Sequence, residues 1–351
     1  MLTRYSRMGA SSRLRSLQYI PFLENKGWEI KVSYLFSTSY LDALYNNKPR
    51  LWHSIKAYIN RIKSLYNLGR FDIVWIEKEL FPFFPAIVEK YIKFKGIPYI
   101  VDYDDAIHHR YDRNNCFLIR LMFSKKISVV MRNAAIVIVG NEYLMMKAIK
   151  SGALNIKKIP TVIDLLLYSK PSINSSKSIT IGWIGSPVTS KYLNEIMPAL
   201  LDVKKNFDIK LLAIGYYDKT PLYDDSIIET IPWSEESEVF SLQMFDIGIM
   251  PLPDKSFEKG KCGYKLIQYM GCHLPVVASP VGVNNEIVVN GVNGFLATTI
   301  DDWINSLSTL IINKQLREQM GKNGFDLVKK HFSLKSQSSR IELLLQGLLN
   351  P

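Results

Sequence analysis

The stretch from Phe257 to Ala297 constrains the fold of this chain more than any other part of the sequence. It holds, in order, a loop with two glycines, a helical segment from about 263 to 272, the apolar run 276–278 and a turn that ends at Gly282. A short apolar run between turn residues predicts a strand that is buried in a parallel sheet. Lysines near a helix start, and a glycine turn beyond a strand, predict a site for a phosphorylated ligand.

Several side chains of this stretch are candidates for that site. Lys261, Lys265 and Gln268 recur at i, i+4 and i+7, so we expect them to share one face of the helix. Others stand at the helix start or in the glycine turn. The expected ligand-binding residues of the stretch are Lys261, Gly263, Tyr264, Lys265, Gln268, Gly282 and Asn284.

The residues before this stretch predict the rest of a second α/β domain. A strand is expected at 179–184, and it ends in the turn Gly185-Ser186, with Lys191 further along. We add these three residues to the candidate site, because ligands of open α/β sheets bind beyond the carboxyl ends of the strands. Further strands are expected at 210–214, 228–231 and 247–250, and helices over 301–350.

The first half of the chain also begins like a nucleotide-binding domain. A strand at 2–5, a loop containing Gly9, a helix from about 13 to 26 and a strand at 28–32 form a βαβ pattern. The loop lacks GxGxxG, so the pattern gives little support to a dinucleotide site. Gly9 in this turn is a further candidate ligand-binding residue, and Ser11, Ser12 and Arg13 are either part of the same site or only the cap and first turn of the helix.

A cluster of acids and histidines follows one buried strand of the first half. Strands are expected at 71–76 and 98–102, and the second one runs into Asp104, Asp105 and His108. The carboxyl end of a strand is where such sheets place their chemistry, so these three residues are the candidate catalytic groups. Alternatively, the acids only cap the next helix. The histidines do not have HxxH spacing, and no metal site is expected.

Positive charge is concentrated in the first half. Residues 1–170 carry 27 Lys and Arg against 13 Asp and Glu, a net charge of +14, and the remaining residues carry a net charge of −2. Two amphipathic helices with basic flanks are expected at 50–70 and 117–133, and the apolar residues 51, 55, 58, 62 and 65 are expected to form one stripe of the first helix. This asymmetry favours an anionic partner, which is a membrane surface, a phosphorylated substrate or nucleic acid, or else it is only a solvated surface. No nucleic-acid-binding signature is present, so we do not expect nucleic acid as a partner.

Length and cysteine usage limit the remaining possibilities. A chain of 351 residues can form two ordinary domains, and we expect boundaries at 1–168, a polar linker at 169–178, and a second domain at 179–331. The last segment, 332–351, is expected to be a helix. The three cysteines have no metal spacing and cannot all pair, and neither a signal peptide nor a membrane span is visible. We therefore expect a cytoplasmic protein.

The segment KLIQYMGC at 265–272, followed by PVVAS at 275–279 and by Gly282, resembles the donor-binding segment of retaining GT-B glycosyltransferases of family 4, the glycosyl transferases group 1. Family members usually carry two glutamates separated by seven residues, and Gly260 and Gln268 stand at those positions here. They also carry an arginine after the glycine of the first turn, where this chain has Ser186, and a lysine near Lys191. The segment 102–106, DYDDA, is similar to a DxDDA segment of some relatives.

The resemblance implies an α/β protein with two Rossmann-like domains that face each other across a cleft, with the terminal helix crossing back to the first domain. It implies transfer of a sugar, with retention, from a nucleoside diphosphate sugar on the second domain to a glycan or polyprenyl-linked acceptor on the first, as in bacterial surface polysaccharide synthesis. No cofactor is implied. Together with the basic first half, it predicts peripheral attachment to the anionic inner face of the plasma membrane. Two alternatives are a nucleotide-sugar epimerase and a non-catalytic nucleotide-sugar-binding protein.

Overall fold

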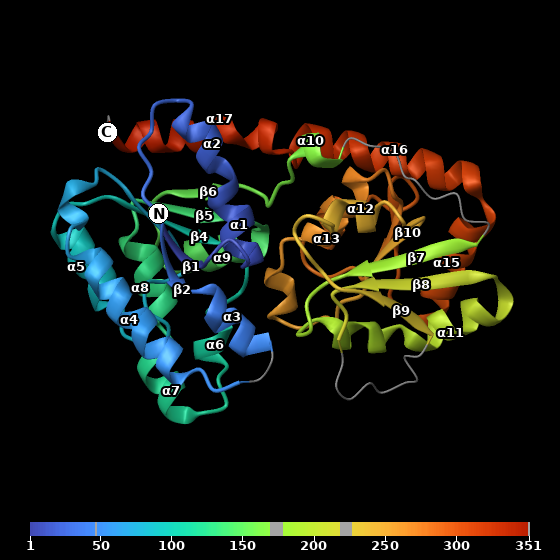
Figure 1. Cartoon of the computed structure of the whole chain (residues 1–351), viewed down its shortest axis with the longest axis horizontal. Coiled ribbons are helices and arrows are strands. Elements are labelled where there is room, and N and C mark those ends of the chain that lie inside the picture. Colours follow the sequence, from blue (N-terminus) through green and yellow to red (C-terminus); the bar gives the residue numbers. More distant parts are fainter. Residues whose placement is uncertain (46–47, 169–177, 218–226, 350–351) are drawn as a thin grey trace. The chain divides into compact units, whose positions relative to one another are not determined.

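A computed structural model describes residues 1–45, 48–168, 178–217 and 227–349, which form two α/β units (Figure 1). The first unit comprises Met1–Thr161, Gly260–Cys262 and the chain from Gln337 onward, and the second comprises Val162–Lys259 and Gly263–Ser336. Residues 162–168 thus belong to the second unit, where Ile163 accepts a hydrogen bond from Leu334 N (2.8 Å) and donates one to Phe332 O (3.0 Å). The expected linker at 169–178 lies, except for Ser178, outside the described residues.

The first unit is built on a six-stranded parallel sheet with the order β2-β1-β3-β4-β5-β6. Its strands are β1 Leu2–Tyr5, β2 Ser33–Phe36, β3 Val74–Glu77, β4 Tyr99–Tyr103, β5 Ile136–Val139 and β6 Ile156–Lys158. Its helices are α1 Ala10–Arg15, η1 Leu17–Tyr19, α2 Ile20–Glu24, α3 Thr38–Tyr45, α4 Leu51–Leu65, η2 Leu68–Arg70, α5 Ile87–Phe94, α6 His109–Asp112, α7 Phe117–Phe123, α8 Lys126–Asn133 and α9 Glu142–Lys150.

The strand order determines which helices share a face of this sheet. The connections β2 to β3, β3 to β4 and β4 to β5 all advance in one direction, so right-handed crossovers place α4, α5 and α8 on one face. The connection from β1 to β2 runs the other way and places α1 and α2 on the opposite face, as Figure 1 shows. Apolar residues of the central strands and of the covering helices form a continuous core.

Three boundaries predicted for this unit are wrong. The helix expected at 13–26 is interrupted, and it restarts at α2 with Pro21, which cannot donate a backbone hydrogen bond. The strand expected at 28–32 lies instead at Ser33–Phe36, where it pairs with β1 in a register that places Ser33 beside Leu2. The helix expected at 117–133 is divided into α7 and α8.

The second unit has its own six-stranded parallel sheet with the order β12-β11-β10-β7-β8-β9, and the strands expected at 179–184, 210–214, 228–231, 247–250 and 276–278 are confirmed. The strands are β7 Ile179–Ile184, β8 Ile209–Ile214, β9 Ile228–Ile231, β10 Ile247–Met250, β11 Val276–Ala278 and β12 Gly294–Leu296. The helices are α10 Leu165–Tyr168, η3 Ser190–Glu195, α11 Met197–Asn206, α12 Glu238–Leu242, η4 Glu258–Gly260, α13 Tyr264–Gly271, α14 Asn284–Ile287, α15 Ile300–Ile312 and α16 Lys314–His331. The last helix, α17 Leu334–Leu349, begins in this unit and belongs to the first unit from Gln337 onward.

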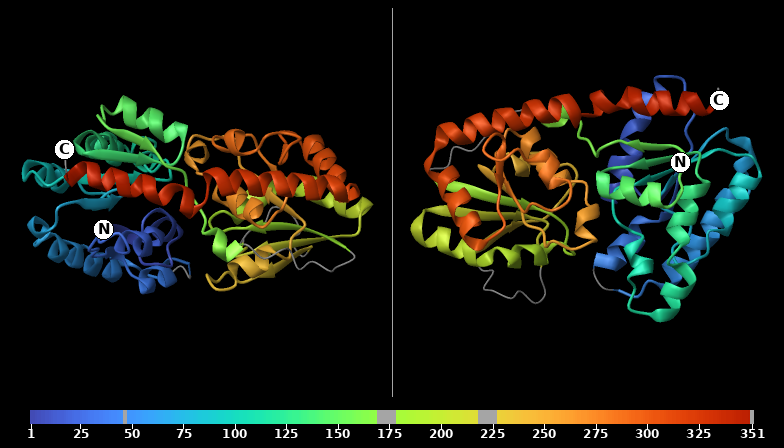
Figure 2. Two further views of the ribbon diagram at one scale, coloured as in Figure 1. Left: turned by 90° about the horizontal axis from the view of Figure 1, so that it is seen from above. Right: turned by 180° about the vertical axis from the view of Figure 1, so that it is seen from behind.

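Local capping signals divide the helical region after residue 300. Thr299 accepts a hydrogen bond from Asp302 N while the Asp302 side chain bonds back, which is a capping box that starts α15. Asn313 caps α16 by accepting a hydrogen bond from Leu316 N. Two apolar clusters fill the second unit, and Figure 2 shows helices on both faces of each sheet. None of the helices in the described ranges is long and apolar enough to cross a bilayer.

Candidate functional site

The carboxyl ends of β1 and β3 in the first unit are joined by buried polar contacts. Glu77, the last residue of β3, is 2% exposed, and its Oε2 accepts hydrogen bonds from Ser12 Oγ at 2.5 Å and from Arg4 N at 2.7 Å. Ser12 Oγ in turn accepts a hydrogen bond from Tyr5 N. Gly9 begins the same turn, where a Cβ would lie 2.4 Å from Tyr5 Cβ. Ser12 therefore fixes the turn after β1, rather than projecting to solvent.

Lys78 connects this edge to the acidic segment after β4. Its ammonium lies 2.7 Å from Asp104 Oδ1 and 3.2 Å from Asp105 Oδ2, and it donates a hydrogen bond to Ser11 Oγ at 3.1 Å. The Lys78 backbone is left-handed, with φ of 64°, which is an uncommon conformation for a residue with a side chain. Lys78 is 6% exposed, whereas the Asp105 side chain is 31% exposed. The structure thus confirms that Asp104 and Asp105 lie together after a strand end. It also shows that Lys78 is the cation that pairs with them.

Electrostatics fix the charge state of this group. Burial alone would raise the pKa of Asp105, but Lys78 and then Lys261 outweigh it and hold the pKa at about 2. Burial would lower the pKa of Lys78, and Asp104 and Asp105 raise it instead. At neutral pH Lys78 is therefore a cation and Asp105 a carboxylate that is a weak proton acceptor. Such a carboxylate is better suited to orienting a hydroxyl group than to deprotonating it.

Three further buried ion pairs support this edge, and sequence analysis missed them. Arg15 donates from Nη2 to Asp102 Oδ1 at 2.7 Å and from Nε to both carboxylate oxygens at 3.2 Å. Glu79 accepts from Arg4 at 3.2 Å and from the Tyr111 hydroxyl, and its carboxylate also contacts Lys126. The available signal was the set of charged residues, at 77–79 and at 102, 104 and 105, that ends two otherwise apolar runs.

The segment Gly260–Cys262 belongs to the first unit and is held there by Asn141. The Asn141 side chain caps α9 through Leu144 N, and its Nδ2 donates to the carbonyls of Gly260 and Lys261, both at 2.9 Å. The Cys262 thiol donates to Asp104 O at 3.1 Å. Lys261 is therefore near the acids of the first unit, which its effect on Asp105 also shows.

His108 belongs to a separate group of polar rings. It is 4% exposed, its ring lies 4.0 Å from that of His109, and burial, followed by His109, lowers its pKa to about 3. His109 uses both ring nitrogens, at 2.9 Å from Asp112 Oδ1 and 2.7 Å from the Tyr143 hydroxyl. His108, His109 and Asp112 lie close enough for a metal ion. Because Asp112 and Tyr143 already occupy the His109 nitrogens, we assign no metal to this group.

In the second unit, helix α13 begins at Gly263, which is its N-cap with φ of 65°. A Cβ at Gly263 would lie 2.5 Å from Ile287 Cδ1 and 3.1 Å from Val283 Cγ1, so this turn requires glycine. Lys261 lies before the helix, and the expected common face of Lys261, Lys265 and Gln268 is therefore wrong for Lys261. The left-handed glycine breaks the helical phase on which that expectation depended.

Lys265, in the first turn of α13, stacks on an aromatic ring. Its ammonium lies 4.0 Å from the centroid of Trp183, near the carboxyl end of β7, within the range of a cation–π interaction. Trp183 is 1% exposed, and a Cβ at Gly185 would lie 2.2 Å from its ring. The glycine after β7 is therefore needed to make room for Trp183. The contact holds Lys265 at the same sheet edge as the Gly185 turn.

Gln268 points into the core of the second unit. It is 2% exposed and its Nε2 donates to the Tyr168 hydroxyl at 3.1 Å, so little of its surface is available to a ligand. Sequence analysis missed Glu258, a buried carboxylate that accepts a hydrogen bond from the Tyr192 hydroxyl at 2.7 Å. Glu258 lies two residues before Gly260. Gly260 stands where members of the family that the sequence resembles usually carry a glutamate.

The remaining predicted residues form the turns around this edge. Ser186 N donates to Thr189 Oγ1 at 3.1 Å, and Lys191 is exposed in η3 with its ammonium 5.8 Å from the ring centroid of Tyr192. Gly282 is left-handed, with φ of 55°, and a Cβ there would meet Lys259 O at 2.6 Å. Asn284 is 1% exposed, donates to Ser279 O, and leaves its buried Oδ1 without a hydrogen-bond partner. Tyr264 is half-buried.

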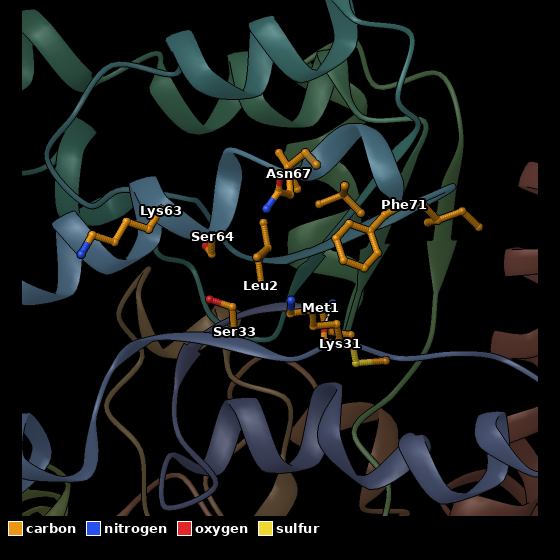
Figure 3. A pocket seen from close by; sticks show the side chains of 11 residues that line it. Met1, Leu2, Lys31, Ser33, Lys63, Ser64, Asn67 and Phe71 are labelled. Atoms are coloured by element: carbon orange, nitrogen blue, oxygen red, sulfur yellow. Dashed lines mark hydrogen bonds between the residues drawn. The ribbon is translucent and has the colours of Figure 1, made fainter.

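A pocket in the first unit lies at the other edge of its sheet. Met1, Leu2, Ser33 and Val74 line it, at the amino ends of β1, β2 and β3 (Figure 3). In open parallel sheets, ligands bind beyond the opposite ends of the strands, the carboxyl ends. We therefore do not assign this pocket to the candidate site.

Comparison with known proteins gives a consistent result. Residues 178–313, most of the second unit, match the family described as "Glycosyl transferases group 1". An uncharacterized glycosyltransferase of Methanocaldococcus jannaschii is 31% identical over 155 residues, which cover 42% of this chain and 42% of that relative. The alignment thus spans less than half of the length of this curated relative.

Solved structures are similar over almost the whole chain. A glycosyltransferase from Rickettsia africae has a TM-score of 0.69 at 12% identity, with 99% of this chain and 97% of that one covered. HepE from Anabaena, in complex with UDP and glucose, has a TM-score of 0.66 at 16% identity, covering 93% and 88%. The expected α/β fold with two parallel six-stranded sheets is confirmed, and it matches that of GT-B glycosyltransferases.

Proposed function

We propose that this protein is a glycosyltransferase that moves a sugar from a nucleoside diphosphate sugar to a hydroxyl group of an acceptor. The observation that carries the proposal is the match of residues 178–313 to glycosyl transferases group 1, because this range contains the whole Gly185, Gly263 and Lys265 edge. HepE, which has a similar fold, binds UDP and UDP-glucose. A uridine diphosphate sugar is therefore the first donor to test.

Lys265 is the proposed cation for the donor diphosphate. It is half-buried in the first turn of α13, where the positive end of the helix dipole also attracts phosphate. The bond from the anomeric carbon to the diphosphate oxygen breaks, and the leaving diphosphate takes the electron pair. Stabilising that charge is the main electrostatic task of such a site. Lys265 and the helix perform it in the proposal without a metal ion.

The acceptor hydroxyl group is proposed to bind at the first unit, beside Lys78, Asp104 and Asp105. The partly exposed Asp105 accepts its hydrogen bond and orients it, while Lys78 keeps both acids in place. The hydroxyl oxygen forms the new bond to the anomeric carbon, and its proton leaves with the departing diphosphate, because the pKa of Asp105 is too low for a general base at neutral pH. Retention of the anomeric configuration completes the proposal and is supported by the family resemblance alone.

The proposed acceptor is a glycan or a polyprenyl-linked sugar, as in the synthesis of bacterial surface polysaccharides. The support for a lipid-linked acceptor is the net charge of +14 in residues 1–170, which suits a protein that works at the anionic inner face of the plasma membrane. A soluble donor and a membrane-bound acceptor can meet only at that surface.

Incubation with a panel of UDP-, GDP- and ADP-sugars tests the proposal, with release of the free nucleoside diphosphate as the readout. We expect one donor to raise the melting temperature and to be turned over faster when an acceptor is added. Nuclear magnetic resonance of the product reports the anomeric configuration. Conversion of the sugar without an acceptor would instead identify an epimerase, and binding without turnover would identify a non-catalytic protein. Lys314→Ala, in an exposed ion pair on α16, is the matched control for Lys265→Ala.

A further inference from the structure

Helix α4 presents an apolar stripe to solvent. Trp52, Ile55, Ile59, Ile62 and Tyr66 follow each other at spacings of three and four residues, so they share one helical face. Their exposed fractions are 80%, 41%, 48%, 61% and 91%. Scattered apolar residues on a surface need no explanation, but five in one row on one helix do. We call these five residues the α4 stripe.

The α4 stripe is not the side of the helix that packs on its own unit. Ala57 and Arg61, on the opposite side, are 6% and 1% exposed, and Tyr58 and Leu65 pack against the core of the first unit. The apolar residues 51, 55, 58, 62 and 65, which the sequence placed in a single stripe, are therefore divided between the core and the surface. Helix α4 has more apolar positions than its own sheet can cover.

Positive charges border the stripe, and negative charges are absent. Lys56 and Lys63, at i and i+7, are exposed beside it. The sequence from 43 to 71 contains no Asp or Glu. An apolar face that has exposed lysines along its border is the pattern of a helix that lies in a membrane interface.

Helix α7 repeats this pattern. Phe117, Leu118, Leu121 and Met122 are 62–67% exposed, and the sequence from 113 to 141 contains no Asp or Glu. Helix α7 directly precedes α8, which covers the same face of the sheet as α4 (Figure 1). Two separate elements of the first unit thus combine exposed apolar side chains with positive charge.

We propose that the α4 stripe docks on an anionic lipid bilayer, with its apolar side chains inserted among the acyl chains and Lys56 and Lys63 at the level of the headgroups. Trp52 and Tyr66 stand at the two ends of the stripe, about 21 Å apart at 1.5 Å per residue, so the helix lies along the membrane surface. A bilayer fits better than a protein partner, because Lys56 and Lys63, seven residues apart on the border of the stripe, are best neutralised by an extended anionic surface. The inference deepens the proposed function by naming the surface that reaches a lipid-linked acceptor.

Trp52 provides a direct test in the whole protein. The other five tryptophans, Trp28, Trp75, Trp183, Trp233 and Trp303, are buried or half-buried. With vesicles of phosphatidylglycerol and phosphatidylcholine, we expect a blue shift of the tryptophan emission and quenching by lipids brominated in their acyl chains. Trp52→Phe should keep vesicle binding and lose the quenching. Vesicle binding without quenching of Trp52 would overturn the proposal, because the membrane would then contact another surface.

Charge variants test the proposed contact of Lys56 and Lys63 with the lipid headgroups. Lys56→Glu with Lys63→Glu replaces two cations of the border by anions, so it should weaken vesicle binding by about 30-fold or more. Lys322→Glu with Lys329→Glu on α16 has the same i, i+7 spacing and is also exposed, and it should have a much smaller effect. Equal loss in both pairs, equal binding to neutral vesicles, or self-association through the stripe in sedimentation would contradict the proposal. Donor hydrolysis in solution should be unchanged in these variants, which separates this test from that of the proposed function.

Discussion

The two sheets of this protein have similar topologies but very different carboxyl edges. In the first unit, that edge holds a network of buried charges in which Arg15 pairs with Asp102 and Lys78 pairs with Asp104 and Asp105. In the second unit, glycines and aromatic rings form the edge, and Lys265 lies over Trp183. The first edge neutralises its own charge, whereas the second offers a cation and a helix start to an outside anion.

This difference separates the two partial reactions of the proposed function. A self-neutralised network resists reorganisation and is suited to holding a neutral hydroxyl group in one orientation. A turn built from glycines lets the backbone approach a phosphate closely, as glycine does in other phosphate-binding turns. Changes at the first edge should therefore affect stability or turnover, and changes at the second edge should affect donor binding.

The largest expected effect is on folding. Arg15→Met leaves the Asp102 carboxylate buried without its partner, and breaking a buried pair in this way costs about 3–5 kcal/mol. We expect a large fall in the melting temperature, measured by calorimetry or circular dichroism. Lys265→Met, which removes a cation from the other edge, should lower it far less. Equal melting temperatures for the two variants would contradict the contrast between the edges.

The next effect is on turnover. Asp105→Asn keeps the shape of the side chain and removes its charge, so we expect a fall of the turnover number by about a hundredfold if Asp105 orients the acceptor. Because Lys78 and Lys261 hold the pKa of Asp105 at about 2, against an ordinary 3.8, this carboxylate stays charged above pH 4. The stability that it contributes is then complete above about pH 4 and is lost as the pH falls towards 2. Unchanged turnover in the variant would show that Asp104 and Asp105 have no role in the reaction and only cap the next helix.

A smaller effect is expected for the donor cation. Lys265→Ala should weaken donor use by about 10- to 100-fold, which corresponds to roughly 1.5–3 kcal/mol for a charge-assisted hydrogen bond. The melting temperature without ligand should change little. Steady-state kinetics against donor concentration measure the effect, with Lys314→Ala as the control. A wild-type rate in Lys265→Ala would remove this residue from the site.

The smallest effect distinguishes the glycines of the second edge from ordinary ones. Gly263 and Gly291 both have positive φ, of 65° and 78°, but only Gly263 has side chains within contact of a Cβ. Either alanine variant costs about 1–2 kcal/mol for the left-handed backbone. Gly263→Ala should cost about 1–2 kcal/mol more than Gly291→Ala, because it also clashes with Ile287. Equal free energies of unfolding would show that the turn can widen.

Local sequence patterns were sufficient for the second sheet and insufficient for the charge network. The apolar runs of β8, β10 and β11 are short and bounded by turn residues, so their positions could be predicted. The pairing of Arg15 with Asp102, 87 residues away, depends on which strands are adjacent, and no local pattern encodes it. The same reason explains Lys78, whose partners follow the next strand along the chain.

Two predictions about individual side chains depended on helical phase and failed for physical reasons. The left-handed Gly263 places Lys261 outside α13, and Asn141 holds it with the first unit. The apolar positions of α4 had been assigned to one face, but the sheet covers only part of them. Periodicity predicts that a helix is amphipathic, but it does not tell which apolar face meets the core.

The most direct test of the central claim is equilibrium binding of the nucleoside diphosphate by calorimetry to the wild type, Lys265→Ala and Asp105→Asn. If the second edge holds the donor and the first edge orients the acceptor, the dissociation constant should rise by about 10- to 100-fold in Lys265→Ala and stay near the wild-type value in Asp105→Asn. Equal binding by the wild type and Lys265→Ala, or a loss of binding in Asp105→Asn alone, would contradict this division between the two edges.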